Sequence, residues 1–271
     1  MLKLRINPIV VRDLKNIRDC KNQTRPNILI DEIYEYDMDS TKAELEHYCE
    51  CADFVFHLAG VNRPVEPDEF MRGNFGFTSE LLAYLKKYKN KAAIMLSSSI
   101  QATLSGRFGD SEYGRSKLAG EQLLLDYGKE TGAKIAVYRF PNLMGHSRPK
   151  YNSAVSTFCW AVANDEPYVV NDRSTELELL YIDDLVEGMF DLLEGKEQHC
   201  TFDGVETVLC DEGQYCRSRT RLLWEKLLIC SNSLSSSPRR FLCRRCRTVL
   251  LQRNCLASIL LIFRRKSSHI L

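Results

Sequence analysis

The 271-residue sequence predicts an α/β fold, a doubly wound parallel sheet with helices on both of its faces. Two observations predict it: short apolar runs alternate with amphipathic stretches, and the apolar runs are nearly continuous, as in strands buried on both faces. Parallel strands need long right-handed crossovers, which the amphipathic stretches supply as helices. Ligands of such a sheet bind at the carboxyl ends of its strands, so residues that follow the apolar runs are candidates for function.

The amino-terminal part predicts a helix, a strand and a second helix. Residues 11–18 have the pattern of the end of a first helix, and Asn27 to Tyr36 alternates apolar and polar residues as a strand does. Helix-forming residues then run from Thr41 to Glu50, and Ser40 or Thr41 can cap that helix with its side-chain oxygen.

The next part predicts three buried strands separated by two helices. The strands are the apolar runs from Asp53 to Leu58, from Ala92 to Leu96 and from Lys134 to Phe140. The helices are Ser79 to Tyr88 and Glu112 to Glu130. With the strand before them, these elements give a repeating β-α order, which is typical of a parallel sheet.

The sequence has no glycine before Gly60. A dinucleotide-binding sheet normally begins with a strand and a glycine-rich turn, which lets a pyrophosphate approach the first helix. Met1 to Val10 instead contains Pro8 and no G-x-x-G-x-x-G spacing. We therefore expect the first strand and this turn to be missing, so that the sheet binds another ligand or has lost its phosphate-binding edge.

The composition changes near residue 210. The chain carries a net charge of +1, but residues 216–271 alone carry +12, which leaves −11 for residues 1–215. The basic segment could be a nucleic-acid arm, or Cys243-x-x-Cys246 could begin a zinc site, but interleaved aromatic residues and a second cysteine pair are absent. We therefore expect residues 1–209 to form the functional domain, residues 210–271 not to be a native domain, and neither nucleic acid nor a metal to bind.

Membrane and secretion signals are also absent from the sequence. No apolar run approaches the roughly 18 residues that a membrane span requires. The amino terminus lacks the basic, apolar and small-residue pattern of a secretory signal. These observations predict a cytoplasmic protein without a membrane partner.

Residues suited to proton transfer follow the strand that begins at Ala92. Ser97, Ser98 and Ser99 end that strand, and Tyr113 and Lys117 come soon after it, four residues apart. Residues four apart share one face of a helix, so the phenol and the ammonium can point into one site. A neighbouring cation stabilises a phenolate, so we expect Lys117 to lower the pKa of Tyr113. A serine hydroxyl could hold the substrate oxygen, which suits proton transfer coupled to hydride transfer at a carbonyl carbon.

Seven stretches, in order along the chain, carry a family resemblance. They are Ala52 to Pro64, Gly73 to Gly76, Leu96 to Thr103, Tyr113 to Leu124, Tyr138 to Gly145, Pro149 to Cys159 and Val170 to Met189. Together they resemble the extended short-chain dehydrogenase/reductase family of nucleotide-sugar enzymes, and within it the reductases of capsular polysaccharide synthesis. The resemblance implies a Rossmann-like fold with a small nucleotide-sugar-binding subdomain from about residue 142.

The resemblance also implies roles for single residues. Tyr113 would be the general acid and base, Lys117 would tune it and bind the nicotinamide ribose, Ser99 would hold the reacting oxygen, and Asn74 would complete the catalytic tetrad. The turn formed by His57, Leu58, Ala59 and Gly60 would line the cofactor beside its adenosine diphosphate. A tight turn that only ends the strand is an equal alternative for His57.

Three residues of the subdomain resemble contacts to the sugar nucleotide: Asn142, Asn152 and Arg173. An exposed ion pair is an alternative for Arg173. The sequence Tyr181-Ile-Asp-Asp184 matches a strand-to-helix signature of the family, in which Asp183 or Asp184 would cap the helix.

The activity implied is the NADPH-dependent reduction of a UDP-linked 4-keto-6-deoxy-N-acetylhexosamine by a homodimer. NADP is the cofactor expected from the resemblance, but Glu35 and Asp37 follow the first predicted strand, and an acid there would favour NAD. Similar enzymes continue into a zinc-containing cupin domain that the sequence does not match, so no such epimerase activity is inferred. Another nucleotide-sugar epimerase or dehydratase, or a non-catalytic remnant that binds nucleotide-sugar, stays an alternative.

Overall fold

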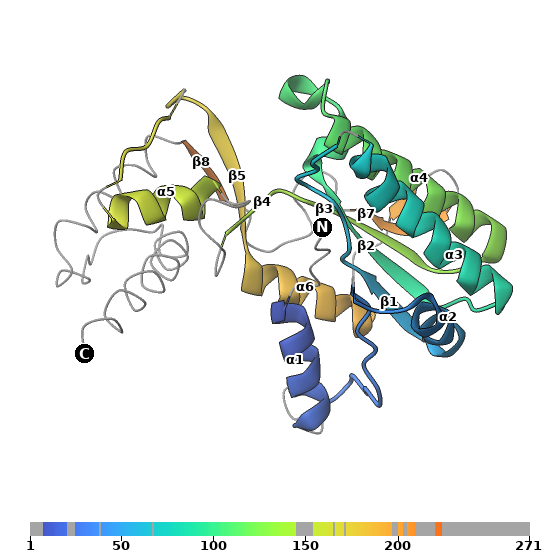
Figure 1. Cartoon of the computed structure of the whole chain (residues 1–271). Helices are drawn as coiled ribbons and strands as arrows, with labels where there is room; N and C mark the ends of the chain where they lie inside the picture. Colours follow the sequence, from blue (N-terminus) through green and yellow to red (C-terminus); the bar gives the residue numbers. More distant parts are fainter. Residues whose placement is uncertain are drawn as a thin grey trace. The chain divides into compact units, whose positions relative to one another are not determined.

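The computed structural model describes residues 8–20, 25–37, 39–66, 68–144, 154–164, 166–170, 172–196, 200–202, 205–209 and 220–223. The chain divides into two compact units (Figure 1). Residues 1–140 and 189–215 form the first unit, and residues 141–188 and 216–271 form the second. None of the helices in the described part combines the length and the apolar character that crossing a membrane requires.

The first unit contains a five-stranded sheet in the order β1-β2-β3-β7-β6. Three strands predicted from the sequence are confirmed as parallel neighbours: β1 (Phe54–His57), β2 (Ala93–Ser99) and β3 (Ile135–Phe140). Strand β7 (Val205–Leu209) is parallel to β3, and β6 (Cys200–Phe202) is antiparallel to β7. Within the described residues β1 is an edge strand, because the strand predicted from Asn27 to Tyr36 does not pair with it. Residues 1–7 lie outside the described part.

Three helices cover one face of this sheet: α2 (Lys42–Cys51), α3 (Phe77–Lys87) and α4 (Glu112–Thr131). Their apolar side chains share one core with alternate residues of β2 and β3, because alternate residues of a strand face the same side. The members of this core that are least exposed include Leu85, Ile94, Leu124, Ile135 and Val137. This core packs α4, the helix with the catalytic candidates, against β2 and β3.

The first two helices contain the segments that the sequence predicts to be helical. Helix α1 (Pro8–Asp19) contains the predicted 11–18 segment, and Val10, Leu14 and Ile17 on one side of it are buried. Helix α2 begins after Thr41, whose hydroxyl accepts a 3.2 Å hydrogen bond from the Glu44 amide while the Glu44 carboxylate accepts one from the Thr41 amide. Thr41 is therefore the predicted cap, in a capping box.

The predicted strand from Asn27 to Tyr36 is not formed. The segment is irregular, and its inward-facing residues are Ile28, Ile30, Ile33 and Tyr36. Their spacing changes from two to three residues, which no single face of a pleated strand can keep. Tyr36 stacks on Phe77 of α3 at 5.7 Å between ring centres, so the segment packs through side chains instead of strand pairing.

The second unit holds a small sheet of three strands. Strand β5 (Glu176–Tyr181) lies between β4 (Asn142–Met144), which is parallel to it, and β8 (Thr220–Leu223), which is antiparallel. Helix α5 (Ala154–Ala163) also belongs to this unit. Strand β8 lies in the basic segment from residue 210. The remaining residues of that segment, with Cys243 and Cys246, lie outside the described part.

Helix α6 (Ile182–Leu193) follows β5 directly, so the predicted strand-to-helix signature is confirmed. Asp183 and Asp184 lie in its first turn, after the first helical residue Ile182, so the prediction that one of them caps the helix is wrong. Burial and the neighbouring acids Asp183 and Glu187 raise the pKa of Asp184. After the helix, Glu194 accepts a 3.2 Å hydrogen bond from Arg25, which ties this end to the segment that follows α1.

Candidate active site

A short helical turn after β2 positions the start of α4. This turn, η2 (Ile100–Thr103), contains Gln101, whose side-chain oxygen accepts a 2.7 Å hydrogen bond from the Ser111 hydroxyl. The same hydroxyl accepts a 2.9 Å bond from the Gly114 amide and so caps α4. A Cβ atom at Gly114 would lie 2.2 Å from the Gln101 carbonyl oxygen, so only glycine allows this approach. A second turn, η3 (Gly106–Phe108), completes the connection.

The approach brings Tyr113 to the end of β2. The hydroxyl of Ser99, the last residue of β2, lies close enough to the phenol of Tyr113 to lower its pKa against the effect of burial. Ser99 also accepts a 3.2 Å bond from the Gln101 amide and is buried. The ring of Phe70 lies 5.7 Å from the ring of Tyr113. The serine and the tyrosine predicted to act on one substrate oxygen are therefore neighbours at the end of β2.

Lys117 lies one turn further along α4 and is 6% exposed. Its ammonium lies 5.8 Å from the centre of the Tyr113 ring and donates a 3.0 Å hydrogen bond to the Ser97 carbonyl. Burial lowers the pKa of Lys117 to about 8, and the charge of Glu121 acts against this shift. Tyr113 and Lys117 therefore lie side by side, as their spacing of four residues predicts.

The pKa of Tyr113 differs from the sequence expectation. Burial raises this pKa to about 12, and the hydrogen bond with Ser99 reduces that shift. The expected lowering by Lys117 is wrong for this arrangement, because its ammonium is bound to the Ser97 carbonyl, and desolvation of the phenolate dominates. Tyr113 is therefore a protonated phenol at neutral pH, ready to donate its proton.

Asn74 lies in the helical turn η1 (Met71–Gly76) and is 4% exposed. Its amide oxygen accepts a bond from the Val61 amide, and its amide nitrogen donates to the Val61 carbonyl and to the Ser116 hydroxyl, each at 2.9 Å. Asn74 thus joins the turn after β1 to α4. Its predicted place beside the tetrad residues is observed, and its catalytic role stays a prediction.

The turn after β1 lies against the same side chains. A Cβ atom at Gly60 would lie 2.7 Å from Lys117 Nζ and 2.8 Å from Asn74 Oδ1. Leu58 and Ala59, before it, are half-buried. Glycine at position 60 therefore leaves the room that the Lys117 ammonium needs beside the predicted cofactor-binding turn.

His57, the last residue of β1, is 3% exposed. Its Nε2 lies 2.8 Å from the Thr78 hydroxyl, which donates its own proton to the Asn74 carbonyl at 2.6 Å. Nε2 must therefore be the donor to Thr78, and Nδ1 is an acceptor that has no partner among the described residues. Burial, and then the charge of Lys117, lower the pKa of His57 to about 3.

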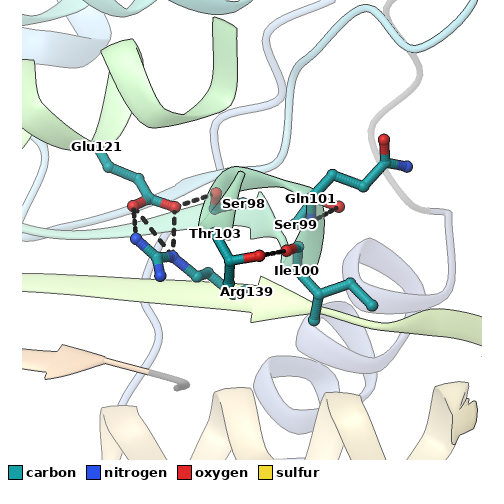
Figure 2. A network of polar contacts seen from close by, with 7 residues as sticks. All are labelled: Ser98, Ser99, Ile100, Gln101, Thr103, Glu121 and Arg139. Atoms are coloured by element: carbon teal, nitrogen blue, oxygen red, sulfur yellow. Dashed lines mark hydrogen bonds and ion pairs between the residues drawn. The ribbon is translucent and has the colours of Figure 1, made fainter. Parts of the chain in front are cut away.

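The structure adds a buried ion pair that the sequence did not single out. Glu121 of α4 accepts hydrogen bonds from Arg139 of β3, the shortest 2.6 Å, and from the Ser98 hydroxyl of β2 (Figure 2). Glu121 follows Lys117 by four residues, and this spacing was the available signal. The signal was missed because a charged residue on a long helix more often faces solvent.

The sequence model of one family, described as the NAD dependent epimerase/dehydratase family, matches residues 4–201. The chain belongs to this family. The resemblance inferred from the seven stretches is therefore confirmed, and by family the chain is that of an enzyme. Within the described residues no group of three or more His, Cys, Asp and Glu side chains could hold a metal ion.

Two relatives of this epimerase/dehydratase chain act in sugar metabolism by their names. It is 39% identical over 166 residues to the UDP-2-acetamido-2,6-beta-L-arabino-hexul-4-ose reductase of Pseudomonas aeruginosa. The aligned residues make up 61% of this chain and 43% of the reductase. It is 34% identical to the capsular polysaccharide assembling protein CapF from Staphylococcus aureus, with a TM-score of 0.71 over 93% of this chain and 63% of CapF. The chain thus spans less than two thirds of either protein.

A third solved structure shares the epimerase/dehydratase fold. MoeE5 in complex with UDP-glucose and NAD gives a TM-score of 0.66 at 20% identity, over 96% of this chain and 95% of that chain. At this identity the likeness shows the fold alone. It confirms the predicted Rossmann-like class.

The predicted substrate residues belong to the second unit of the epimerase/dehydratase chain. Asn142 begins β4 and is exposed, and its side-chain amide donates a 3.2 Å hydrogen bond to the Glu178 carbonyl. Arg173 lies exposed in the turn before β5. Asn152 lies outside the described residues. Their roles toward a sugar nucleotide stay predictions.

Proposed function

We propose that this chain reduces the 4-keto group of a UDP-linked 4-keto-6-deoxy-N-acetylhexosamine, with a reduced nicotinamide cofactor, in capsular or surface polysaccharide synthesis. The observation that carries the proposal is the grouping of the Ser99 hydroxyl, a protonated Tyr113 and the Lys117 ammonium at the end of β2. The name of the Pseudomonas aeruginosa reductase supports the substrate class. CapF supports the place in polysaccharide assembly.

The residues of the site suit the direction of reduction. A bound reduced nicotinamide supplies hydride to the carbonyl carbon. Tyr113 holds its proton at neutral pH, because its pKa is about 12, and can donate it to the carbonyl oxygen. Ser99 can hold the same oxygen through its hydroxyl. The Lys117 ammonium lies 5.8 Å from the centre of the ring, where it would bind the nicotinamide ribose.

The residues present fit one end of a nicotinamide cofactor. Lys117 would hold the nicotinamide ribose, and the turn from His57 to Gly60 would line the cofactor beside its adenosine diphosphate. NADP is our first expectation, and NAD is the second, because Glu35 and Asp37 could favour a free ribose diol. Titration of the chain with each cofactor in turn tests this order.

The proposal also includes the residues that bind the sugar nucleotide and the oligomeric state of the chain. Asn142, Asn152 and Arg173 would contact the UDP-sugar, and the chain would act as a cytoplasmic homodimer. Alanine replacement of Asn142 should raise KM for the UDP-sugar while leaving cofactor binding unchanged. Sedimentation analysis of the purified chain tests the homodimer.

The experiment for the activity is direct. The purified chain is mixed with NADPH and a UDP-4-keto sugar, and the absorbance of the reduced nicotinamide is followed. Oxidation by the chain, and none by a Tyr113→Phe variant, is the expected result. The proposal is rejected if the chain oxidises no NADPH and a variant with an introduced glycine-rich turn is also inactive. Conversion of a UDP-sugar with a free 4-hydroxyl, without net oxidation or reduction of the nicotinamide, would instead identify an epimerase or a dehydratase.

A second candidate, a non-catalytic nucleotide-sugar-binding protein, is favoured by one observation. The sequence has no glycine before Gly60, so no glycine-rich turn binds a pyrophosphate there. The loss of several charge-assisted hydrogen bonds, each about 1.5–3 kcal/mol, would weaken the binding of a cofactor by orders of magnitude. Calorimetric titration with NADPH separates the two, because a Kd below about 100 μM, near −5.5 kcal/mol, contradicts this candidate.

A further inference from the structure

The pairing of Glu121 with Arg139 is buried at the carboxyl ends of β2 and β3. Glu121 is 2% exposed and Arg139 is 9% exposed. Arg139 Nε lies 3.0 Å from Glu121 Oε1, and the terminal nitrogen lies 2.6 Å from Oε2, so the contact is bidentate. Ser98 is the partner of Arg139 in the parallel register, and its hydroxyl donates to Glu121 from the same face (Figure 2). The carboxylate is therefore fixed from two strands.

The fixed carboxylate lies in line with the candidate catalytic residues. Tyr113, Lys117 and Glu121 are each four residues apart on α4, so they lie on one face of that helix. Neighbouring serines of β2 hold the last two of them: the Ser97 carbonyl accepts from Lys117, and the Ser98 hydroxyl donates to Glu121. The buried ammonium of Lys117 therefore lies between two side chains of α4: the phenol of Tyr113 is one turn nearer the amino end of the helix, and the carboxylate of Glu121 is one turn nearer its carboxyl end.

We propose that Glu121 is a positioning residue that holds Lys117 charged and directed into the site, and that Arg139 and Ser98 fix Glu121 for this task. The proposal rests on the proposed function only for the role of Lys117 in the reaction. The charge of Lys117 and its dependence on Glu121 are properties of the chain without cofactor or substrate.

The charged and titratable groups that face Lys117 come from three elements. Tyr113 and Glu121 lie on α4, His57 on β1, and Arg139 on β3 beyond Glu121. Tyr113 and His57 are neutral at pH 7, because burial raises the pKa of the first to about 12 and lowers that of the second to about 3. The negative charge that acts on Lys117 from this set is that of Glu121, which raises the pKa of the ammonium against the effect of burial.

Stability alone gives a weak reason for this ion pair. A buried salt bridge contributes little relative to apolar side chains of similar volume, because both charges lose their hydration. Apolar residues fill the same face of both strands nearer their amino ends, at Ile94, Leu96, Ile135 and Val137. The change from apolar to charged residues occurs where Lys117 reaches the sheet, which favours a role toward that side chain.

The test measures the ionisation of Lys117 directly. The full chain is labelled with carbon-13 at the lysine ε position, the Lys117 signal is assigned from its absence in a Lys117→Met variant, and its shift is followed against pH. Glu121→Gln should move the Lys117 midpoint down by about one pH unit or more, because an opposite charge is lost. Arg139→Gln should move the midpoint up, because the carboxylate then acts without its partner. Glu130→Gln removes an exposed carboxylate of the same helix and should leave the midpoint unchanged.

A double variant keeps the test decisive if a single variant does not fold. Glu121→Gln with Arg139→Gln leaves no unpaired buried charge, and it should still lower the Lys117 midpoint, by less than Glu121→Gln alone. An unchanged midpoint in whichever of these variants folds overturns the proposal. If the chain is active, the alkaline limb of its pH profile should move with the midpoint. If it is inactive, the proposed function fails while the titration still decides the role of Glu121.

Discussion

The ammonium of Lys117 lies 5.8 Å from the centre of the Tyr113 ring but donates its hydrogen bond to the Ser97 carbonyl, 3.0 Å away. The phenol of Tyr113 therefore keeps its proton at neutral pH, with the ammonium of Lys117 beside its ring. Because the ammonium is engaged by that carbonyl, it does not offset the effect of burial, and the pKa of Tyr113 stays at about 12.

Tyr113→Phe removes the proton donor and leaves the ring in place against Phe70. We expect turnover of a UDP-4-keto sugar to fall by about 10²–10⁴-fold, the usual contribution of a general acid. The measurement is the rate of nicotinamide oxidation at saturating substrate. Calorimetric titration of the same variant with NADPH is the control and should match that of the parent chain. Turnover within about tenfold of the parent chain would assign proton donation to another residue.

Lys117→Met should stabilise the chain at neutral pH while abolishing turnover. The folded pKa of Lys117, about 8, lies below its ordinary 10.5, so between these values the unfolded chain binds a proton that the folded chain does not. Stability from this group therefore rises with pH over that window, and below pH 8 the buried charge costs about 3 kcal/mol. Methionine removes that cost and loses one hydrogen bond of about 1 kcal/mol, for a net gain of about 2 kcal/mol.

Urea unfolding at pH 7 and pH 9.5 measures this effect. The variant should be more stable than the parent chain at pH 7, and the difference should shrink at pH 9.5. A variant that is less stable at both pH values would show that the Ser97 bond outweighs the buried charge.

The positions of Tyr113, Lys117 and Ser99 could be predicted because local rules fix them. A spacing of four on a helix sets two of them on one face, and the end of a parallel strand sets the third at the ligand edge. The elements that carry them, β2 and α4, have long and regular apolar patterns. Sequence reasoning succeeds at such places because local preference and tertiary packing agree.

The pKa of Tyr113 and the segment from Asn27 to Tyr36 could not be predicted in the same way. The first depends on how deeply the phenol is buried and on where the Lys117 ammonium turns, and both are set by packing. The second begins with an alternating pattern, but the spacing of its inward-facing residues changes from two to three, and the stacking of Tyr36 on Phe77 that goes with it is set by packing. The ion pair of Glu121 and Arg139 joins residues 18 apart in sequence on two elements, so neither local pattern shows it.

His57→Gln should reduce the loss of stability in acid. The folded pKa of His57, about 3, lies below its ordinary 6.5, so the unfolded chain binds the extra proton between these values. Stability from His57 is fully present above pH 6.5 and falls with pH, by about 1.4 kcal/mol per pH unit, until pH 3. Glutamine can still donate to Thr78 but does not titrate.

The measurement is the free energy of unfolding at pH 6 and pH 4 for the parent chain and for the variant. The fall between the two pH values should be smaller in His57→Gln by up to about 3 kcal/mol. Replacement of the exposed His47 by glutamine is the matched control and should keep the fall of the parent chain. Equal falls in all three chains would mean that His57 becomes charged without unfolding the site.

Gly114→Ala tests the close approach of η2 to the start of α4. Alanine in a helix is normally favoured over glycine by about 1 kcal/mol, so an unconstrained site would become more stable. Here the added Cβ would lie 2.2 Å from the Gln101 carbonyl oxygen, a backbone atom that cannot move alone. We expect a loss of about 1–3 kcal/mol in urea unfolding and a lower turnover, because Tyr113 must move away from Ser99.

Gly109→Ala is the matched control for that substitution. Gly109 has helical backbone angles, φ −52° and ψ −39°, and its nearest neighbour to an added Cβ is 3.6 Å away. Its stability should therefore stay within about 0.5 kcal/mol of the parent chain. If Gly114→Ala gave the same small effect, η2 and α4 could separate freely, and the contact of Ser99 with Tyr113 would not depend on glycine at position 114.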